Sequence, residues 1–189
     1  MFIRSERLFL RPIWPEEAGE LGALVADRAV ARQLTAPPSR DGGDCARGWI
    51  EPPREPLLPR FGITLPSAHG ARLMGWIGLR RDAGDVGLAC WIGRPFWGRG
   101  YASEAARAVL GLARAIGHRR IVAEHFTDDA ASARLLAGLG FTPTGEARAR
   151  LSWARGGEAL TTAHALALEP DNWGGDNDPD GPDSSMRAA

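Results

Sequence analysis

The chain has 189 residues, of which 44% are hydrophobic and 24% charged, and its formal net charge is zero. These values are typical of a single soluble globular domain. No apolar run approaches the roughly 18 residues that a membrane-spanning helix needs, and the N-terminus lacks the pattern of a secretory signal. We therefore expect a cytoplasmic protein that has neither a membrane nor a nucleic acid as its partner.

The zero net charge hides an uneven distribution. From Glu169 onward there are six acidic residues and one arginine, which leaves the rest of the chain with a net charge of about +5. The segment from Pro170 is rich in Asp, Gly, Pro and Asn and too poor in apolar residues to offset the entropy of ordering it. We predict one domain over residues 1–168 and a disordered acidic tail over residues 169–189.

Cysteine and histidine give no sign of a metal site. The two cysteines, Cys45 and Cys90, form neither a disulfide framework nor a zinc motif, and the four histidines lack metal-ligand spacing. All 23 basic residues are arginine, so no lysine is available for catalysis.

The first part of the chain predicts a strand, a helix and an irregular insertion. Alternation over Leu8–Ile13 indicates a strand, and Pro15 with two acidic residues after it is typical of a helix start. The stretch Pro37–Arg60 is rich in Pro, Gly and Arg, with one helical piece near Asp44–Ile50. It is either a loop that faces the substrate or a surface connection.

The remainder predicts a meander followed by alternating helices and strands. The expected elements are strands at Phe61–Leu65, Leu73–Leu79 and Val86–Ile92, a helix at Tyr101–Ile116, a strand at Ile121–Phe126, a helix at Ala130–Leu139, and closing strands at Leu151–Trp153 and Leu160–Leu168. This order indicates a mixed α+β domain.

One segment carries a binding motif. Between the strand that ends at Ile92 and the helix that begins at Tyr101, the chain passes through Gly98, Arg99 and Gly100. Such a loop presents free backbone N–H groups at a helix N-terminus, where an anion binds well. By itself the motif also fits an ordinary turn. It lacks the third glycine of a dinucleotide fingerprint and the lysine of a P-loop.

Three blocks together resemble the GNAT acetyltransferases, and in particular the RimJ/RimL type of ribosomal-protein N-terminal acetyltransferase. Residues 97–105 (Trp-Gly-Arg-Gly-Tyr-Ala-Ser-Glu-Ala) are similar to the acyl-CoA loop, and residues 4–11 are similar to the opening strand of that branch. Residues 129–141 resemble its Asn-x-x-Ser helix, which ends in Leu-Gly-Phe. The blocks occur in the family's order.

The resemblance implies a GNAT fold and acetyl-CoA as cosubstrate. We expect a largely antiparallel mixed sheet of about seven strands with about four helices, splayed between the fourth strand (86–92) and the fifth (121–126). The cofactor would lie in this splay. The residues expected to bind it are Trp91 and Ile92 on the strand edge, Trp97, Gly98, Arg99, Gly100, Tyr101 and Ala102 at the pyrophosphate, and Asp129 and Ser132 near the thioester.

The implied reaction is direct attack of a primary amine, from a small molecule or a protein N-terminus, on the thioester. Relatives often use a tyrosine as the acid, but Tyr101 is the one tyrosine here and lies in the phosphate loop. Ser132 is then the expected acid. Gly87 stands where relatives often have an acidic residue, which leaves Glu124, Asp85 or a water chain as the general base.

Two other functions remain open, as does the oligomeric state. Asp129 in place of the motif's Asn, the missing tyrosine and the missing strand acid are also compatible with a GNAT-fold module that binds acyl-CoA without turnover. The loop alone is compatible with a nucleotide-binding protein. The chain could act as a monomer or a homodimer.

Overall fold

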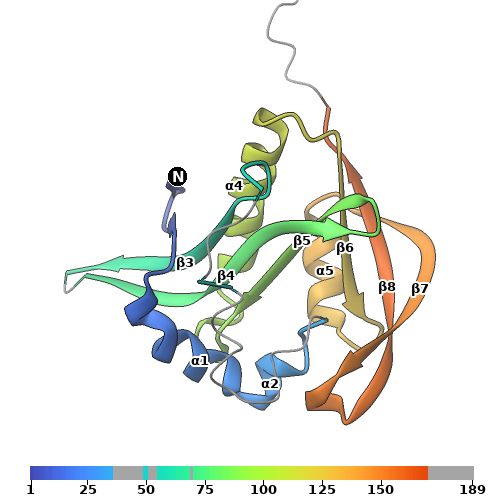
Figure 1. The fold of residues 1–189 in the computed structure, drawn as a ribbon, viewed down its shortest axis with the longest axis horizontal. Helices are drawn as coiled ribbons and strands as arrows, with labels where there is room; N and C mark the ends of the chain where they lie inside the picture. Colours follow the sequence, from blue (N-terminus) through green and yellow to red (C-terminus); the bar gives the residue numbers. More distant parts are fainter. Residues whose placement is uncertain (36–48, 51–54, 69, 170–189) are drawn as a thin grey trace, which may run out of the picture.

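The computed structural model describes residues 1–35, 49–50, 55–68 and 70–169. An eight-stranded sheet runs through this part of the chain in the order β1-β2-β3-β4-β5-β6-β8-β7 (Figure 1). Its strands are β1 (Ile3–Arg4), β2 (Phe9–Arg11), β3 (Arg60–Ser67), β4 (Gly70–Asp82), β5 (Asp85–Ile92), β6 (Arg120–Phe126), β7 (Thr142–Ser152) and β8 (Gly157–Ala167).

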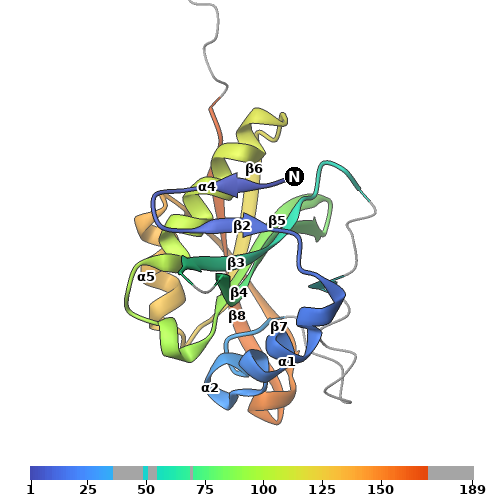
Figure 2. The same cartoon turned by 90° about the vertical axis from the view of Figure 1, so that its left-hand side faces the viewer.

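Helices cover the sheet in two groups (Figure 2). The first group is α1 (Ala18–Ala26) and α2 (Arg28–Ala31), which pack with Trp76 and Trp91 in one apolar cluster. The second group is α4 (Tyr101–Ala115) and α5 (Ala130–Gly138), which share a larger cluster with the opposite face of the strands. The sheet is therefore buried on both faces at its centre, which is where β5 lies.

The sheet separates between β5 and β6. These two strands run parallel and are paired at one position only, Gly87 with Val122. By contrast, β4 pairs with β5 from Gly75 to Asp82, and β6 pairs with β8 over its whole length. The splay begins beyond Gly87, so the residues from Leu88 to Ile92 pair with β4 on one side and have no paired strand on the side of β6.

The mixed α+β class, the largely antiparallel sheet and the position of the splay are confirmed. Two expectations differ in detail. The eighth strand is the two-residue β1, which is too short to give a periodic signal. The closing strand expected at Leu151–Trp153 begins instead at Thr142 and ends at Ser152, and Trp153 lies in a 3-10 turn at residues 153–155.

Several predictions fall outside the described residues. They are the acidic tail, apart from Glu169, the environment of Cys45, and most of the insertion at Pro37–Arg60. Of the expected helical piece at Asp44–Ile50, residues 49–50 are described and are helical. Among the described residues, no helix is both long and apolar enough to cross a membrane.

Gly75 on β4 lies against the backbone of β5. A Cβ atom there would stand 2.2 Å from the carbonyl oxygen of Trp91 and 2.9 Å from the Cα of Ile92. We expect Gly75→Ala to lower the free energy of unfolding by about 2–4 kcal/mol, because two paired strands would have to separate. Urea denaturation measures this.

The matched control for this change is Gly22→Ala in the middle of α1, where a Cβ would meet nothing within 4 Å. There the substitution should stabilise the protein by up to about 1 kcal/mol through helix propensity. Equal effects of the two variants would contradict the close approach of β4 to β5.

Candidate active site

The chain leaves β5 through a loop whose two glycines adopt left-handed backbone angles. Gly98 has a φ of +71° and Gly100 a φ of +77°, and α4 begins at the next residue. A Cβ on Gly98 would meet nothing within 4 Å, so packing does not require glycine there. The backbone conformation does, since a side chain in this region costs about 1–2 kcal/mol.

The first turn of α4 is a ready anion site. The first intrahelical bond recorded at this end runs from the N–H of Glu104 to the carbonyl of Gly100. The amides before Glu104 have no carbonyl one turn earlier in the helix to bond, and the helix dipole adds positive potential to them. A phosphate fits both properties.

The N-terminal segment fastens this loop in place. The carboxylate of Glu104 accepts hydrogen bonds from the Ser5 hydroxyl, the Arg7 amide and the Arg7 guanidinium, each at 2.7 Å. Arg7 also donates to the carbonyl of Arg99 at 3.1 Å and lies over the ring of Tyr101. Two of the recognised sequence blocks are thus in direct contact.

A cleft of about 520 Å³ opens between this loop, β5 and α5. Its described walls bring together most of the predicted cofactor residues with one predicted catalytic residue, Ser132. Two arginines face it from opposite sides, Arg99 from the loop and Arg134 from α5. The predicted cofactor residues that line it are Trp91, Ile92, Trp97, Gly98, Arg99, Gly100, Tyr101, Ala102 and Ser132.

Two residues of this cleft correct or extend the expectation. The carbonyl of Ile92, expected on the free strand edge, already accepts a 2.6 Å hydrogen bond from the indole N–H of Trp97. Arg134 was not anticipated. It stands three residues after Ala131, which also lines the cleft, and so shares a helix face with it. A phosphate group in the cleft would find positive charge on both walls.

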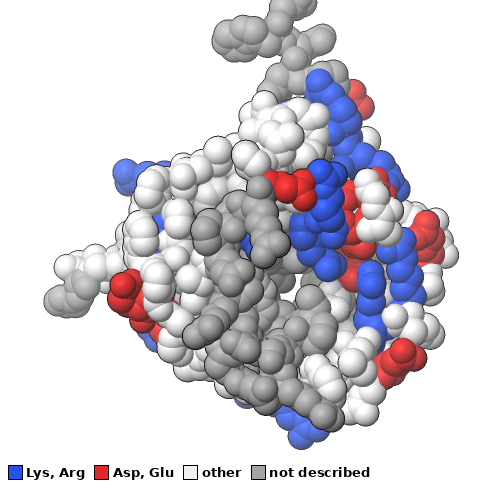
Figure 3. All heavy atoms as spheres, viewed as in Figure 1, with Lys and Arg blue, Asp and Glu red and all other residues white. Residues whose placement is uncertain are grey.

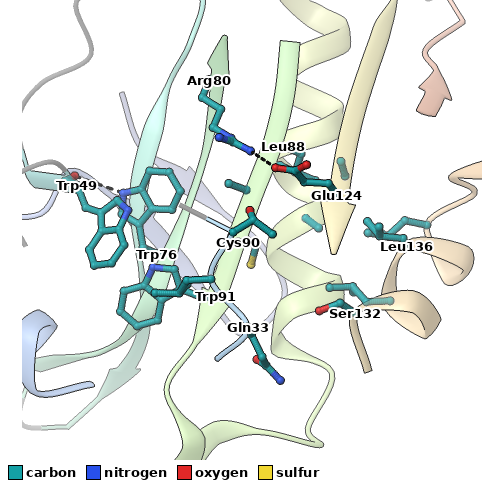
Figure 4. Close-up of a pocket in the computed structure, with 17 residues that line it drawn as sticks. Gln33, Trp49, Trp76, Arg80, Leu88, Cys90, Trp91, Glu124, Ser132 and Leu136 are labelled. Carbon is teal, nitrogen blue, oxygen red and sulfur yellow. Dashed lines mark hydrogen bonds and ion pairs between the residues drawn. The ribbon is translucent and has the colours of Figure 1, made fainter. Parts of the chain in front are cut away.

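A second cavity of about 130 Å³ adjoins the cleft (Figure 4). We call it the chamber. It lies where β5 and β6 diverge, with tryptophans on one side and leucines from α5 on the other. The cleft and the chamber share five described residues, which we call the junction: Gln33, Cys90, Trp91, Ser132 and Leu135.

The sequence between residues 7 and 142 matches the model of the acetyltransferase (GNAT) domain. This match covers most of the chain. The chain belongs to the GNAT acetyltransferase family.

Solved structures share the fold of this GNAT domain at low identity, and no curated protein matches the chain. A GNAT acetyltransferase from Bacillus anthracis aligns with a TM-score of 0.70 and 19% identity, over 88% of this chain and 98% of that one. The RimL ribosomal L7/L12 alpha-N-protein acetyltransferase, solved with coenzyme A, gives 0.71 and 19%, over 90% and 100%. The microcin C7 self-immunity acetyltransferase MccE, solved with acetyl-CoA and AMP, gives 0.69 and 15%, over 86% and 93%.

Asp129 serves this GNAT domain as a helix cap and does not line the cleft among the described residues. Its carboxylate accepts bonds from the amides of Ala131 and Ser132 at the start of α5. Its second oxygen accepts the Ser132 hydroxyl at 2.7 Å. The proton of Ser132 therefore points at Asp129, and the lone pairs of the hydroxyl remain available to a ligand.

Glu124 lines the chamber rather than the cleft. Its side chain is 4% exposed and is held by Arg80 at 3.2 Å and by Arg150 at 3.1 Å, with Thr161 at 3.4 Å. Arg80 reaches it by leaning over Gly87, where a Cβ would stand 3.6 Å from its Cγ. The nearest atom to that Cβ position is the Cβ of Asp82 at 3.2 Å, so the glycine at the place of the expected strand acid relieves crowding against Asp82.

Asp85, the other carboxylate considered as the base, and Cys90, a thiol at the junction, are both unsuited to catalysis. Asp85 lies at the β4–β5 turn, away from the chamber, and pairs with Arg120. Cys90 stands at the junction, but burial raises the pKa of its thiol to about 12. At neutral pH it is protonated and a poor nucleophile. The described residues contain no group of His, Cys, Asp and Glu side chains that could hold a metal ion.

Arg155, in the β7–β8 connection, ties the two sides of the junction together. Its Nε donates to the carbonyl of Arg32, next to Gln33, at 2.9 Å. Its Nη1 donates to Asp128, next to the cap of α5, at 2.7 Å, which lowers the pKa of that carboxyl. The guanidinium also lies 4.0 Å from the ring centre of Phe126. Sequence reasoning missed this residue, because its partners are distant along the chain.

We expect Gly98→Val to weaken acetyl-CoA binding at least tenfold, because the side chain would stand where the amides face the phosphate. Isothermal calorimetry with acetyl-CoA measures the Kd. Gly145→Val is the matched control, since Gly145 has a φ of +84° and also has nothing within 4 Å of its Cβ position, but lies on β7. Both variants carry the backbone strain, and only the first should lose affinity. Unchanged affinity in Gly98→Val would remove the loop from the binding site.

We expect Arg155→Ala to lower the free energy of unfolding by about 1–2 kcal/mol, since two hydrogen bonds and a ring contact are lost. Arg155→Lys should recover less than half of this, because an ammonium cannot reproduce the planar fork. Arg81→Ala, which breaks an exposed ion pair with Glu55, should change stability by less than about 0.5 kcal/mol. Similar losses for the Arg155 and Arg81 variants would contradict the bridging role.

Proposed function

We propose that this GNAT domain transfers the acetyl group of acetyl-CoA to a primary amine by direct attack, without an acyl-enzyme. The observation that carries the proposal is that the two cavities share the junction residues. An anion-binding loop opens into a cleft, and the cleft meets a separate chamber at a junction that contains a hydroxyl. Two substrates can thus approach one another from opposite sides of the splay.

The loop residues from Trp97 to Ala102 would hold the pyrophosphate, with Arg99 and Arg134 adding charge. Bound acetyl-CoA supplies a thioester whose carbonyl carbon the amine attacks. Ser132 and Gln33 are the uncharged polar side chains of the described junction and would orient the reacting groups. The thiol of Cys90 stays protonated, which agrees with direct transfer.

The reaction takes two protons from the nitrogen and gives one to the sulfur. The ammonium first loses a proton to the base, and the nitrogen loses a second proton as the carbon–nitrogen bond forms and the carbon–sulfur bond breaks. We propose that Ser132 gives its hydroxyl proton to the sulfur, after its O–H turns from Asp129, and that the second proton from the nitrogen restores the hydroxyl. Glu124 is the proposed base. Its oxygens already accept bonds from arginines, so the proton of the ammonium reaches it through an intervening water.

The likeness to RimL supports a place in the RimJ/RimL branch, which would make a protein N-terminus one class of acceptor. The likeness to MccE, whose complex includes AMP, equally supports a small-molecule acceptor. The shared proposal is tested by incubating the protein with acetyl-CoA and each amine of a panel, and by measuring the thiol that is released. Mass spectrometry of the protein after incubation with acetyl-CoA alone should show no acetyl adduct.

A second candidate is an acyl-CoA-binding module without turnover. The observation that favours it is the state of the two proposed catalytic groups, since Ser132 donates to Asp129 and both oxygens of Glu124 are occupied. Tight acetyl-CoA binding with no thiol release for any amine would establish the module and overturn the transferase.

We expect Ser132→Ala to lower kcat at least tenfold while the Kd for acetyl-CoA changes by less than about threefold. Ser132→Thr, which keeps a hydroxyl, should recover part of the rate. Ser103→Ala is the matched control, since Ser103 lines the cleft in the first turn of α4, away from the junction. An unchanged kcat in Ser132→Ala would eliminate it as the acid.

A further inference from the structure

One side of the chamber is a cluster of three tryptophans. The ring of Trp49 lies 6.2 Å from that of Trp76 and 5.2 Å from that of Trp91, tilted by 42° and 52°. The indole N–H of Trp76 donates to the carbonyl of Trp49 at 3.3 Å and fixes the pair. Figure 4 shows the three rings together on one side of the chamber. All three line the chamber, and Trp76 and Trp91 are each only 4% exposed.

The opposite side carries several apolar side chains. It is formed by Leu88 and Ala123 on the two diverging strands and by leucines of α5. The charged residues of the described lining are Arg80 and Glu124, and they are paired with each other. A second ammonium or a carboxylate on the acceptor would lose its water here without gaining an unpaired partner, which is costly.

The charged side chains visible on the face shown in Figure 3 do not favour a strongly charged acceptor either. In Figure 3, basic and acidic side chains alternate over the β4–β5 turn and over β7 and β8, with no large area of one sign. The side chains there are paired: Arg120 with Asp85, and Arg148 with Glu146 and Asp82. Such a surface gives little steering to polyamines or to acidic peptides.

The volume of the chamber sets the size of the group that it accepts. About 130 Å³ is close to the roughly 150 Å³ of an apolar cavity that takes up benzene in another protein. A six-membered ring is small enough to enter such a space. A flat ring gains additional stabilisation from tilted or offset contact with aromatic neighbours, which a saturated ring lacks.

We propose that the acceptor is a small arylalkylamine, with its ring in the chamber against Trp49, Trp76 and Trp91 and its nitrogen at the junction. This inference rests on the proposed acetyl transfer and specifies its second substrate. A short alkyl link between them places the ring on the chamber side of Ser132, while the amine faces the cleft.

The test compares kcat/KM for 2-phenylethylamine, 2-cyclohexylethylamine, n-butylamine and spermidine at saturating acetyl-CoA. We expect 2-phenylethylamine to exceed n-butylamine and spermidine by about 10- to 100-fold, through burial of the ring. It should exceed 2-cyclohexylethylamine by about 3-fold or more, through the aromatic contacts. Equal or better turnover of n-butylamine, spermidine or 2-cyclohexylethylamine would overturn the proposal.

Two variants tie the preference to the chamber. Ala89 lines the chamber and not the cleft, so Ala89→Leu should fill the space and lower kcat/KM for 2-phenylethylamine at least tenfold. Trp49→Ala should shrink the preference for phenyl over cyclohexyl. Ala165→Leu on β8, half-buried and outside both cavities, is the control. In all three the Kd for acetyl-CoA should stay within about twofold.

The outcomes distinguish failure of the proposed acceptor from failure of the proposed acetyl transfer. A phenyl preference that survives both Ala89→Leu and Trp49→Ala overturns the chamber as its cause while transfer stands. Turnover of a peptide that begins with Phe, without turnover of 2-phenylethylamine, overturns the small-molecule acceptor. Acetyl-CoA binding without transfer to any amine overturns both the transferase and its proposed acceptor.

Discussion

The structure depends on the place where β5 and β6 stop pairing. These two strands are paired at Gly87 and Val122 and separate beyond that point. Parallel neighbours ordinarily satisfy each other's backbone groups along their length. Here that pairing stops after one position, and the sheet keeps its integrity because β5 is held by β4 on one side and β6 by β8 on the other. The cleft and the chamber both occupy the space that results. Any change that drew the strands together would remove both.

The opening of the sheet is held from several directions by polar contacts distant in sequence. Ser5 and Arg7 bind Glu104 and so fix the start of α4 below the loop. Arg155 joins α2 to the segment before α5 and so fixes the opposite side. Because these groups are hydrogen-bonded to one another, their positions do not rely on a ligand. The loop and the junction are organised before acetyl-CoA arrives, which reduces the entropy that binding costs.

Local signals in the sequence were sufficient for the core of the fold and for the loop, but they could not supply the chamber. The strand periodicity of β3, β4 and β5 and the glycines before α4 are local patterns, and each was found within a few residues of its observed bounds. Most of β7 was missed because its exposed residues, from Thr142 to Ala147, carry no apolar alternation. Arg155 and Gln33 could not be found, since their roles depend on segments that only the fold brings together. Glu124 was named for its chemistry, but its two arginine partners come from β4 and β7, which no local pattern reveals.

The arginines beside the junction have a chemical consequence. Arg80 lines the chamber, Arg155 binds Arg32 and Asp128 beside the junction, and the chain contains no lysine at any position. A guanidinium stays protonated in proteins and is not a nucleophile toward a thioester, whereas an ε-amine that lost its proton would be. With ion pairs built only from arginine, no side-chain amine of this protein competes with the acceptor. The protein is thereby protected against acetylating the side chains that shape its own site.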